Sequence, residues 1–198
     1  MPRPSDQAKR RDLTDRVRAY LVRNGLAGLS LRPLARALGT SDRMLLYYFG
    51  TKEAMVAEAL ALDERRPLLL ARETLASPDS PRDAAGLRRF MEETWRRFGA
   101  PDLRPALPLY LEIMIASLID PDRYGPVLSD LLTEWTDLLA SAFGNLGMTR
   151  ARARAEAALL VDATFGLVVA SLTEGGQERA DEAFRALLDR LEPGWHVS

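Results

Sequence analysis

Residues 30–52 read SLRPLARALGTSDRMLLYYFGTK, and this stretch decides the fold. Ser30 and Ser41 are residue types that favour the position just before a helix, and Gly39 favours a helix end. The pattern predicts one short helix over residues 31–38 and a second that begins at Ser41 and closes at Phe49-Gly50. Two short helices joined by a glycine-containing turn of about three or four residues form a helix-turn-helix.

The rest of the chain also has helical periodicity. Ser5, Thr51, Ser80 and Asp120 are suitable caps, whereas Pro67 and the SPDSP stretch at 77–81 predict breaks. Pro108 and Gly125-Pro126 predict a kink or a later helix start. Apolar spacing predicts further helices over residues 6–24, 52–66, 81–98, 103–119, 121–143, 149–173 and 178–191.

These segments show no useful β alternation, so the predicted fold class is all-α with about nine helices. An N-terminal three-helix module containing the helix-turn-helix occupies residues 1–52, and a connecting helix covers 52–66. Residues 67–198 form a C-terminal helical bundle. Residues 1–52 hold 11 basic and 4 acidic side chains, a charge of +7, whereas residues 67–198 carry 14 and 20, a charge of −6. The basic segment favours a polyanion as partner, the alternative being chance drift of surface charge.

Composition excludes several other kinds of protein. The chain has no cysteine and one histidine, His196, so we expect neither disulfides nor thiolate chemistry, and a reducing cytoplasm is the expected location. We predict no signal peptide and no membrane span, because the apolar runs are too short. An enzyme is disfavoured, since the sequence lacks a glycine-rich phosphate loop and a cluster with metal-ligand spacing. No catalytic residue, metal or cofactor is therefore predicted.

The second helix of a helix-turn-helix enters the major groove with its N-terminal residues facing the bases. Here those residues are Asp42, Arg43 and Met44. Arg43 has the geometry to bond guanine O6 and N7, and Asp42 to accept from cytosine N4. Tyr47 and Tyr48 follow, where their hydroxyls can reach phosphate.

Residues 30–60, SLRPLARALGTSDRMLLYYFGTKEAMVAEAL, resemble the DNA-binding signature of the tetracycline-repressor (TetR) family. The resemblance has specific residues over about 8–62 and only architecture beyond, because the family's C-terminal domains diverge. The matching features are Ser30, Leu34-Ala35, Gly39, Leu45, Tyr47-Tyr48-Phe49 and Lys52.

The resemblance implies a role for each of eight residues. Arg32 and Tyr48 would contact the DNA backbone, and Lys52 would bind phosphate. Ser41, the predicted cap of the recognition helix, is also expected among the DNA-binding residues. The groove would be faced by Asp42, Arg43, Met44 and Tyr47. Two positions depart from the family: Met44 replaces a small hydroxyl residue and Leu46 a tyrosine. With the negative Asp42, these changes predict an atypical operator and weaker DNA binding.

The family also implies a homodimer in which the last two helices of each subunit pair. The segment ALLVDATFGLVVASL is apolar nearly all round, which requires burial on every side, in a dimer or in a monomer core. The expected interface residues are Leu160, Leu167, Val168, Phe184, Leu187, Leu188 and Leu191.

The middle helices would enclose a pocket for an unidentified, largely apolar small-molecule effector. The candidate lining is Trp95, Phe98, Tyr110, Met114, Trp135 and Phe165, each also explicable as plain core, together with Glu112 and Asp162. Glu112 and Asp162 stand among apolar neighbours, so each is paired, solvated or aimed into a cavity.

The predicted function is therefore a ligand-responsive transcriptional regulator, in the first place a repressor that binds a palindromic double-stranded DNA operator as a dimer and is released by the effector. The sign of regulation, the operator, the effector and the regulated genes stay open. The alternative is a helix-turn-helix module for protein interaction or dimerisation, without sequence-specific DNA binding.

Overall fold

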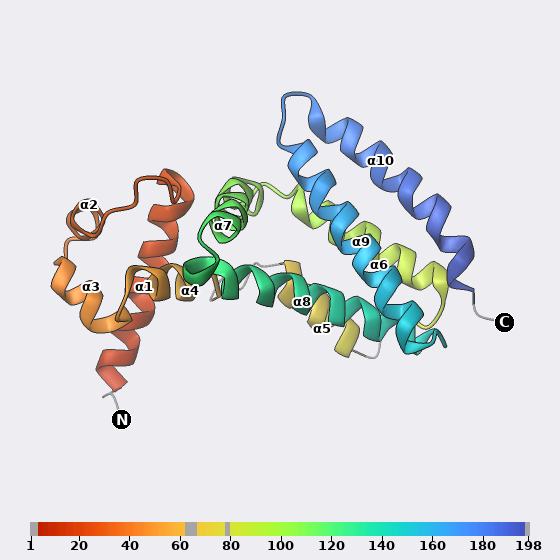
Figure 1. Ribbon diagram of the computed structural model, residues 1–198, viewed down its shortest axis with the longest axis horizontal. Helices are drawn as coiled ribbons and strands as arrows, with labels where there is room; N and C mark the ends of the chain where they lie inside the picture. The colour runs from red at the N-terminus through yellow and green to blue at the C-terminus, as the bar shows by residue number, and fades with distance from the viewer. Residues whose placement is uncertain (1–3, 62–66, 78–79, 197–198) are drawn as a thin grey trace. The chain divides into compact units, whose positions relative to one another are not determined.

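The computed structural model describes residues 4–61, 67–77 and 80–196, and these residues are predominantly helical (Figure 1). Within these ranges the regular structure consists of ten α-helices and two short 3-10 helices, without a strand. The all-α prediction is therefore confirmed. Over the same ranges, no helix combines the length and the apolar character needed to cross a bilayer.

The chain forms two compact units, and the first combines Met1–Glu64 with Pro105–Leu128. It contains α1 (Pro4–Asn24), α2 (Leu31–Ala37), α3 (Asp42–Phe49), α4 (Lys52–Ala61) and α7 (Leu107–Ile119). The sequence-based division places α7 with the C-terminal domain. In the structure, Leu109 and Ile113 of α7 are buried in the same apolar cluster as the helix-turn-helix.

The core of this first unit explains why its short helices are stable. An isolated helix of seven or eight residues is marginal in water, so burial of its apolar face must hold it. Spacing of three to four residues along each helix puts the following side chains in one cluster: Leu13, Val17 and Leu21 of α1; Leu34 and Ala35 of α2; Leu45 and Phe49 of α3; and Met55, Val56, Ala59 and Leu60 of α4.

Caps fix the ends of the helix-turn-helix. The Ser41 hydroxyl accepts a hydrogen bond from the Met44 amide at 3.2 Å, and Thr51 caps α4 by accepting from Ala54 at 3.0 Å. Gly39 closes the turn with φ of 61°. Ser30 stands at the N-cap position of α2, as predicted, but unlike Ser41 its side chain makes no capping hydrogen bond.

The second unit comprises Arg65–Arg104 and Ser129–Ser198. Its helices are α5 (Pro67–Ala76), α6 (Ala84–Phe98), α9 (Arg150–Ser171) and α10 (Gly176–Leu191), followed by the 3-10 helix η2 (Glu192–Trp195). Helix α8 (Pro121–Asn145) belongs to this unit from Ser129 onward. The chain passes out of the unit after Arg104, the first residue of the 3-10 helix η1 (Arg104–Ala106).

The starts of α5, α6 and α7 differ from the ranges drawn from the sequence, each for a local reason. Helix α5 was missed because Pro67 begins a helix, a position where its absent N–H costs nothing. Helix α6 begins at Ala84 because Asp83 is its cap, accepting from Gly86 N at 2.6 Å, rather than at Pro81. Helix α7 begins at Leu107 with Pro108 in its first turn, which is the later start that Pro108 predicts as the alternative to a kink. The predicted end of the connecting helix, residues 62–66, lies outside the described residues.

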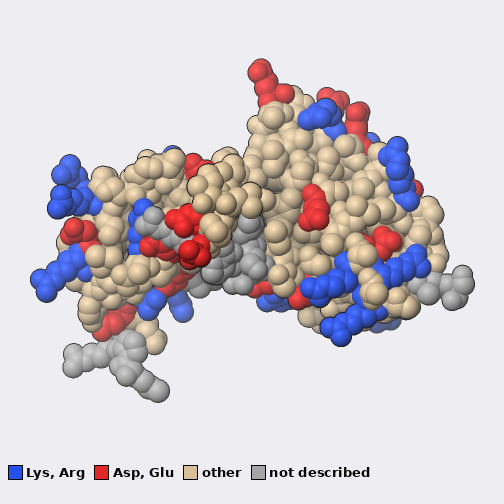
Figure 2. All heavy atoms as spheres, viewed as in Figure 1, with Lys and Arg blue, Asp and Glu red and all other residues tan. Residues whose placement is uncertain are grey.

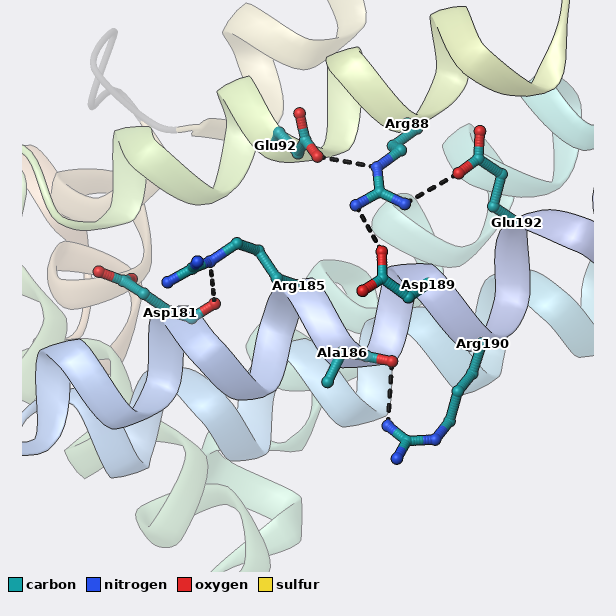
Figure 3. Close-up of polar contacts among 8 residues, drawn as sticks. All are labelled: Arg88, Glu92, Asp181, Arg185, Ala186, Asp189, Arg190 and Glu192. Carbon is teal, nitrogen blue, oxygen red and sulfur yellow. Dashed lines mark hydrogen bonds and ion pairs between the residues drawn. The ribbon is translucent and has the colours of Figure 1, made fainter.

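One arginine joins α6 to the end of α10 (Figure 3). The Arg88 guanidinium contacts Glu92 at 2.9 Å, Asp189 at 2.7 Å and Glu192 at 2.9 Å. Hydrogen bonds to Glu192, then Asp189 and Glu92, raise the pKa of Arg88 above its ordinary value. The planar fork of an arginine suits such a site, because it offers separate N–H groups to each carboxylate.

The turn from α9 to α10 requires a glycine at position 176. A Cβ on Gly176 would overlap the carbonyl oxygen of Ala170 and the hydroxyl of Thr173. We expect Gly176→Ala to lower the free energy of unfolding by about 1–3 kcal/mol, measured by urea denaturation, because the turn must move. Gly144→Ala is the control: no described atom lies within 4 Å of its Cβ position, so helix propensity should raise stability by up to about 1 kcal/mol. Equal stability of the two variants would contradict the close approach of Gly176 to the Ala170 carbonyl and the Thr173 hydroxyl.

Candidate nucleic-acid interface

Helix α3 is held on one face and exposed on the other. Leu45 and Phe49 are buried in the first unit's core, so the opposite face is directed to solvent. That face carries Arg43, Leu46 and Tyr47, at the spacing of three and four residues that aligns side chains on a helix. Tyr47 is 71% exposed and Leu46 is 42% exposed, so both side chains are available to a partner.

The polar residues at the start of α3 lie close together. Asp42 accepts from the Arg43 amide at 2.9 Å, which places its charge at the positive end of the helix. A carboxylate oxygen of Asp42 lies 4.0 Å from the Arg32 guanidinium, whose side chain is 90% exposed, so this ion pair is weak. Figure 2 shows basic side chains projecting along the edge that α2 and α3 form in Figure 1. Arg43 is exposed in the first turn of α3.

The remaining predicted contact residues are partly engaged within the protein. Tyr48 is half-buried and meets Tyr47 edge-to-face, with ring centroids 5.2 Å apart. Met44 is also half-buried. The Lys52 ammonium donates to the Leu29 carbonyl at 3.2 Å, which uses one of its three N–H groups. The other two N–H groups can donate to a phosphate.

Sequence reasoning missed Arg10, which links three helices of this unit. Its guanidinium forms a two-bonded pair with Glu58 of α4, at 2.9 Å and 2.5 Å, and lies 5.8 Å from the ring centroid of Phe49. The hydrogen bond to Glu58 raises the pKa of Arg10. The buried Thr14 hydroxyl donates to the Arg10 carbonyl at 2.9 Å. The 48 positions that separate Arg10 from Glu58 leave no local pattern that would predict this pair.

In the second unit, three predicted pocket residues lie together. Trp95, Phe98 and Trp135 form a chain of ring contacts, with centroids 6.5 Å and 6.3 Å apart. Trp95 also stacks on Phe184 at 4.7 Å and donates its N–H to Asp181 at 2.7 Å. These contacts bury Trp95 and Trp135 among other side chains of the unit.

The other predicted lining residues lie elsewhere. Tyr110, Glu112 and Met114 belong to α7 in the first unit, where the Glu112 carboxylate accepts from the backbone amide of Leu26. Phe165 is half-buried on α9. Asp162 is exposed, which removes the hypothesis that a buried carboxylate on α9 contacts the effector. In the described parts of the chain, no group of three acidic or histidine side chains is arranged to hold a metal ion.

The predicted dimer residues divide into two groups. Leu160, Val168, Phe184 and Leu188 are buried inside the single chain, because they form the stripe by which α9 and α10 pack within the unit. They are therefore unavailable to a partner, contrary to the prediction. Leu167, Leu187 and Leu191 are half-buried. The exposed face of α9 carries Leu159 and Val169, which are 49% and 47% exposed.

Comparison with known proteins gives a match for the segment that contains the helix-turn-helix. Residues 14–59 match the family model described as bacterial regulatory proteins, tetR family. Comparison with curated proteins gives no match. Among solved structures, a transcriptional regulator from Rhodococcus sp. Rha1 is 18% identical with a TM-score of 0.73, over 96% of this chain and 98% of that one.

Two further structures are similar along nearly their whole length. Salmonella enterica GusR is 19% identical with a TM-score of 0.70, covering 98% of this chain and 97% of its own. A proposed transcriptional regulator from Saccharomonospora viridis, solved in complex with choline, is 21% identical with a TM-score of 0.67, covering 93% and 95%. At these identities the structures establish the shared fold. The match over residues 14–59 shows that this segment is similar to the N-terminal domain of the tetR family of bacterial regulatory proteins.

Proposed function

We propose that the protein is a homodimeric transcriptional repressor that binds a palindromic operator through α3 and releases it when a small molecule binds the second unit. The observation that carries this proposal is the exposed face of α3. Arg43, Leu46 and Tyr47 stand outside the core while Leu45 and Phe49 anchor the helix behind them. The +7 charge of residues 1–52 suits the phosphate backbone.

Selection of DNA fragments by the purified protein, followed by sequencing, tests this proposal. We expect enrichment of one palindrome, with affinity that falls as salt rises because bound phosphates release counterions. The half-sites should be separated by about one helical turn or a small multiple of it. If no sequence is enriched even at low salt, the interaction-module alternative replaces the proposal.

A dimer is required to read two half-sites, and α9 offers a surface for it. Leu159 and Val169 are exposed on a face that also holds Gly166 between them, likewise exposed. Apart from its chain neighbours and the backbone of its own helix, no described atom lies within 4 Å of the Cβ position of Gly166, so a partner helix can approach closely. On α10, the residues outside the buried stripe include Ala183 and the half-buried Leu187. We place the interface on these two faces.

The effector would bind beside the aromatic chain of the second unit. Trp95 and Trp135 are buried, so a ligand would reach this chain of rings at the half-buried Phe98, and an aromatic ring face attracts cations. The choline in the structure from Saccharomonospora viridis makes a quaternary ammonium ion a suitable first probe. A molecule that binds the non-DNA-binding conformer better shifts the population away from DNA. Release of the selected operator by such molecules, followed by fluorescence anisotropy, tests this assignment.

A further inference from the structure

The turn between α1 and α2 is held at both ends by side chains from distant helices. It comprises residues 25–30 and contains a backbone hydrogen bond from Leu29 to Leu26 of 3.0 Å. At one end, the Leu26 amide donates to the Glu112 carboxylate of α7. At the other end, the Leu29 carbonyl accepts from the ammonium of Lys52, the first residue of α4. One acidic and one basic side chain thus fix the two ends of the turn.

Gly25 is what allows the carboxylate to approach. Its φ of +73° lies in the left-handed region, which a residue with a Cβ adopts only under strain. A Cβ at Gly25 would also lie 2.8 Å and 2.9 Å from the two oxygens of Glu112, well inside van der Waals contact. Leu109 and Ile113, either side of Glu112 on α7, are buried in the core of the unit and set the position of this carboxylate.

The same turn sets the position of α2. Helix α2 starts at Leu31, immediately after the turn, and its N-cap Ser30 makes no side-chain capping bond that would fix the start independently. Leu34 and Ala35 then pack in the same core as Leu45 and Phe49 of α3. A displacement of the turn therefore moves α2 and, through the core, α3.

We propose that Glu112 is a positioning residue for DNA binding, holding α2 and α3 in their DNA-binding arrangement through the Leu26 amide and making α7 the element through which the second unit acts on them. This rests on the proposed function above. The connectivity supports it: the chain leaves the second unit after Arg104 and re-enters it at Ser129, so the segment that contains α7 is joined covalently to that unit at both ends.

The electrostatic effect of removing Glu112 has the opposite sign to the effect that we propose. Glu112→Ala removes a negative charge, which by itself strengthens binding to polyanionic DNA. Loss of the hydrogen bond to Leu26, by contrast, frees the turn and weakens specific binding. A charge-assisted bond of this kind corresponds to a change of about ten- to a hundredfold in affinity. The direction of the change therefore separates positioning from simple charge.

Affinity for the selected operator and for unrelated DNA is the first measurement, on the full-length dimer. We expect Glu112→Ala to lower operator affinity about ten- to a hundredfold without lowering affinity for unrelated DNA, and Glu112→Gln, whose amide oxygen still accepts, to lie between. Asp120→Asn, on the residue that follows α7, is the charge-matched control and should leave operator affinity equal or higher. Unchanged or tighter operator binding by Glu112→Ala would overturn the proposal.

Amide hydrogen exchange is the second measurement and needs no DNA. We expect Glu112→Ala to speed exchange at Leu26 and at the α2 amides. Exchange at the amide of Val17, a fully buried residue of α1 that reports opening of the whole unit, should stay unchanged. If the wild-type protein selects no operator, the proposed function fails, and this exchange pattern alone decides whether Glu112 positions α2. If the Glu112→Ala variant exchanges the Leu26 and α2 amides at the same rates as the wild type, Glu112 does not position α2.

Gly25→Ala supplies an independent check through a double-mutant cycle. In the wild-type background it introduces both backbone strain and a clash with the Glu112 carboxylate; in the Glu112→Ala background only the strain remains. We therefore expect the substitution to speed Leu26 exchange much less in the second background. Equal effects in the two backgrounds would show that the carboxylate does not lie against this turn.

Discussion

Replacing Gly166 by arginine should convert the dimer that we propose into a folded monomer. Gly166 is exposed on the α9 face that we assign to the interface, and its Cβ position has no described atom within 4 Å. The single chain therefore accommodates the arginine, and helix propensity favours it over glycine. In the dimer, the arginine of each subunit would have to fit between packed helices beside Leu159 and Val169, at a cost of about 1–3 kcal/mol per subunit. Asp162, exposed four residues earlier on the same helix, can pair with the charge, so the cost is mainly steric.

This cost should appear in two measurements. Sedimentation velocity should show a monomer at concentrations where the wild type is a dimer, while circular dichroism shows unchanged helix content. Operator affinity should fall by about 10²–10⁴, because two half-sites are no longer bound by one linked molecule. Gly144→Arg is the matched control, since this helical glycine also has an open Cβ position but lies on α8. A dimeric Gly166→Arg protein would place the interface elsewhere.

Arg43→Ala should abolish preference at one base pair of each half-site. The exposed guanidinium at the start of α3 is the side chain best placed to bond guanine O6 and N7, and each such pair contributes about 1–3 kcal/mol of discrimination. Two half-sites together then lose about 2–6 kcal/mol of operator affinity. Affinity for unrelated DNA should change little, because phosphate contacts carry that binding.

Repeating the DNA selection with the variant measures this directly. The enriched palindrome should persist but lose its preference at one symmetric pair of positions. Arg23→Ala is the control, since it removes an equal charge from an exposed side chain in the last turn of α1, outside the recognition helix. If Arg23→Ala and Arg43→Ala reduce operator affinity equally, Arg43 acts only through its charge.

Local sequence patterns correctly predicted the features of the fold that depend only on residues close together in the chain. The Ser41 and Thr51 caps, the turn at Gly39 and the burial of Leu45 each follow from a few adjacent residues, and the structure contains all of them. Helix α5 was missed because a proline after a charged stretch has two meanings, a break or a first turn, and only the packing that follows decides between them.

Longer-range features could not be predicted from pattern alone. Glu112 was recognised as unusual, but its partner is a backbone amide 86 residues away, which periodicity does not identify. The sequence predicts the dimer interface at the most apolar positions of α9 and α10. Several of these side chains are buried within the single chain. The interface that we propose instead uses side chains such as Val169, which the single chain leaves exposed.

The burial of Leu109 and Ile113 among the N-terminal helices has a consequence for synthesis of the chain. Helices α1 to α4 end at Ala61, so the ribosome must add about fifty more residues before their core is complete. At ordinary elongation rates this delay is about 3–10 s, long compared with helix formation. During that time the growing chain carries a nascent module with an unfilled apolar site, open to chaperones and to other nascent chains.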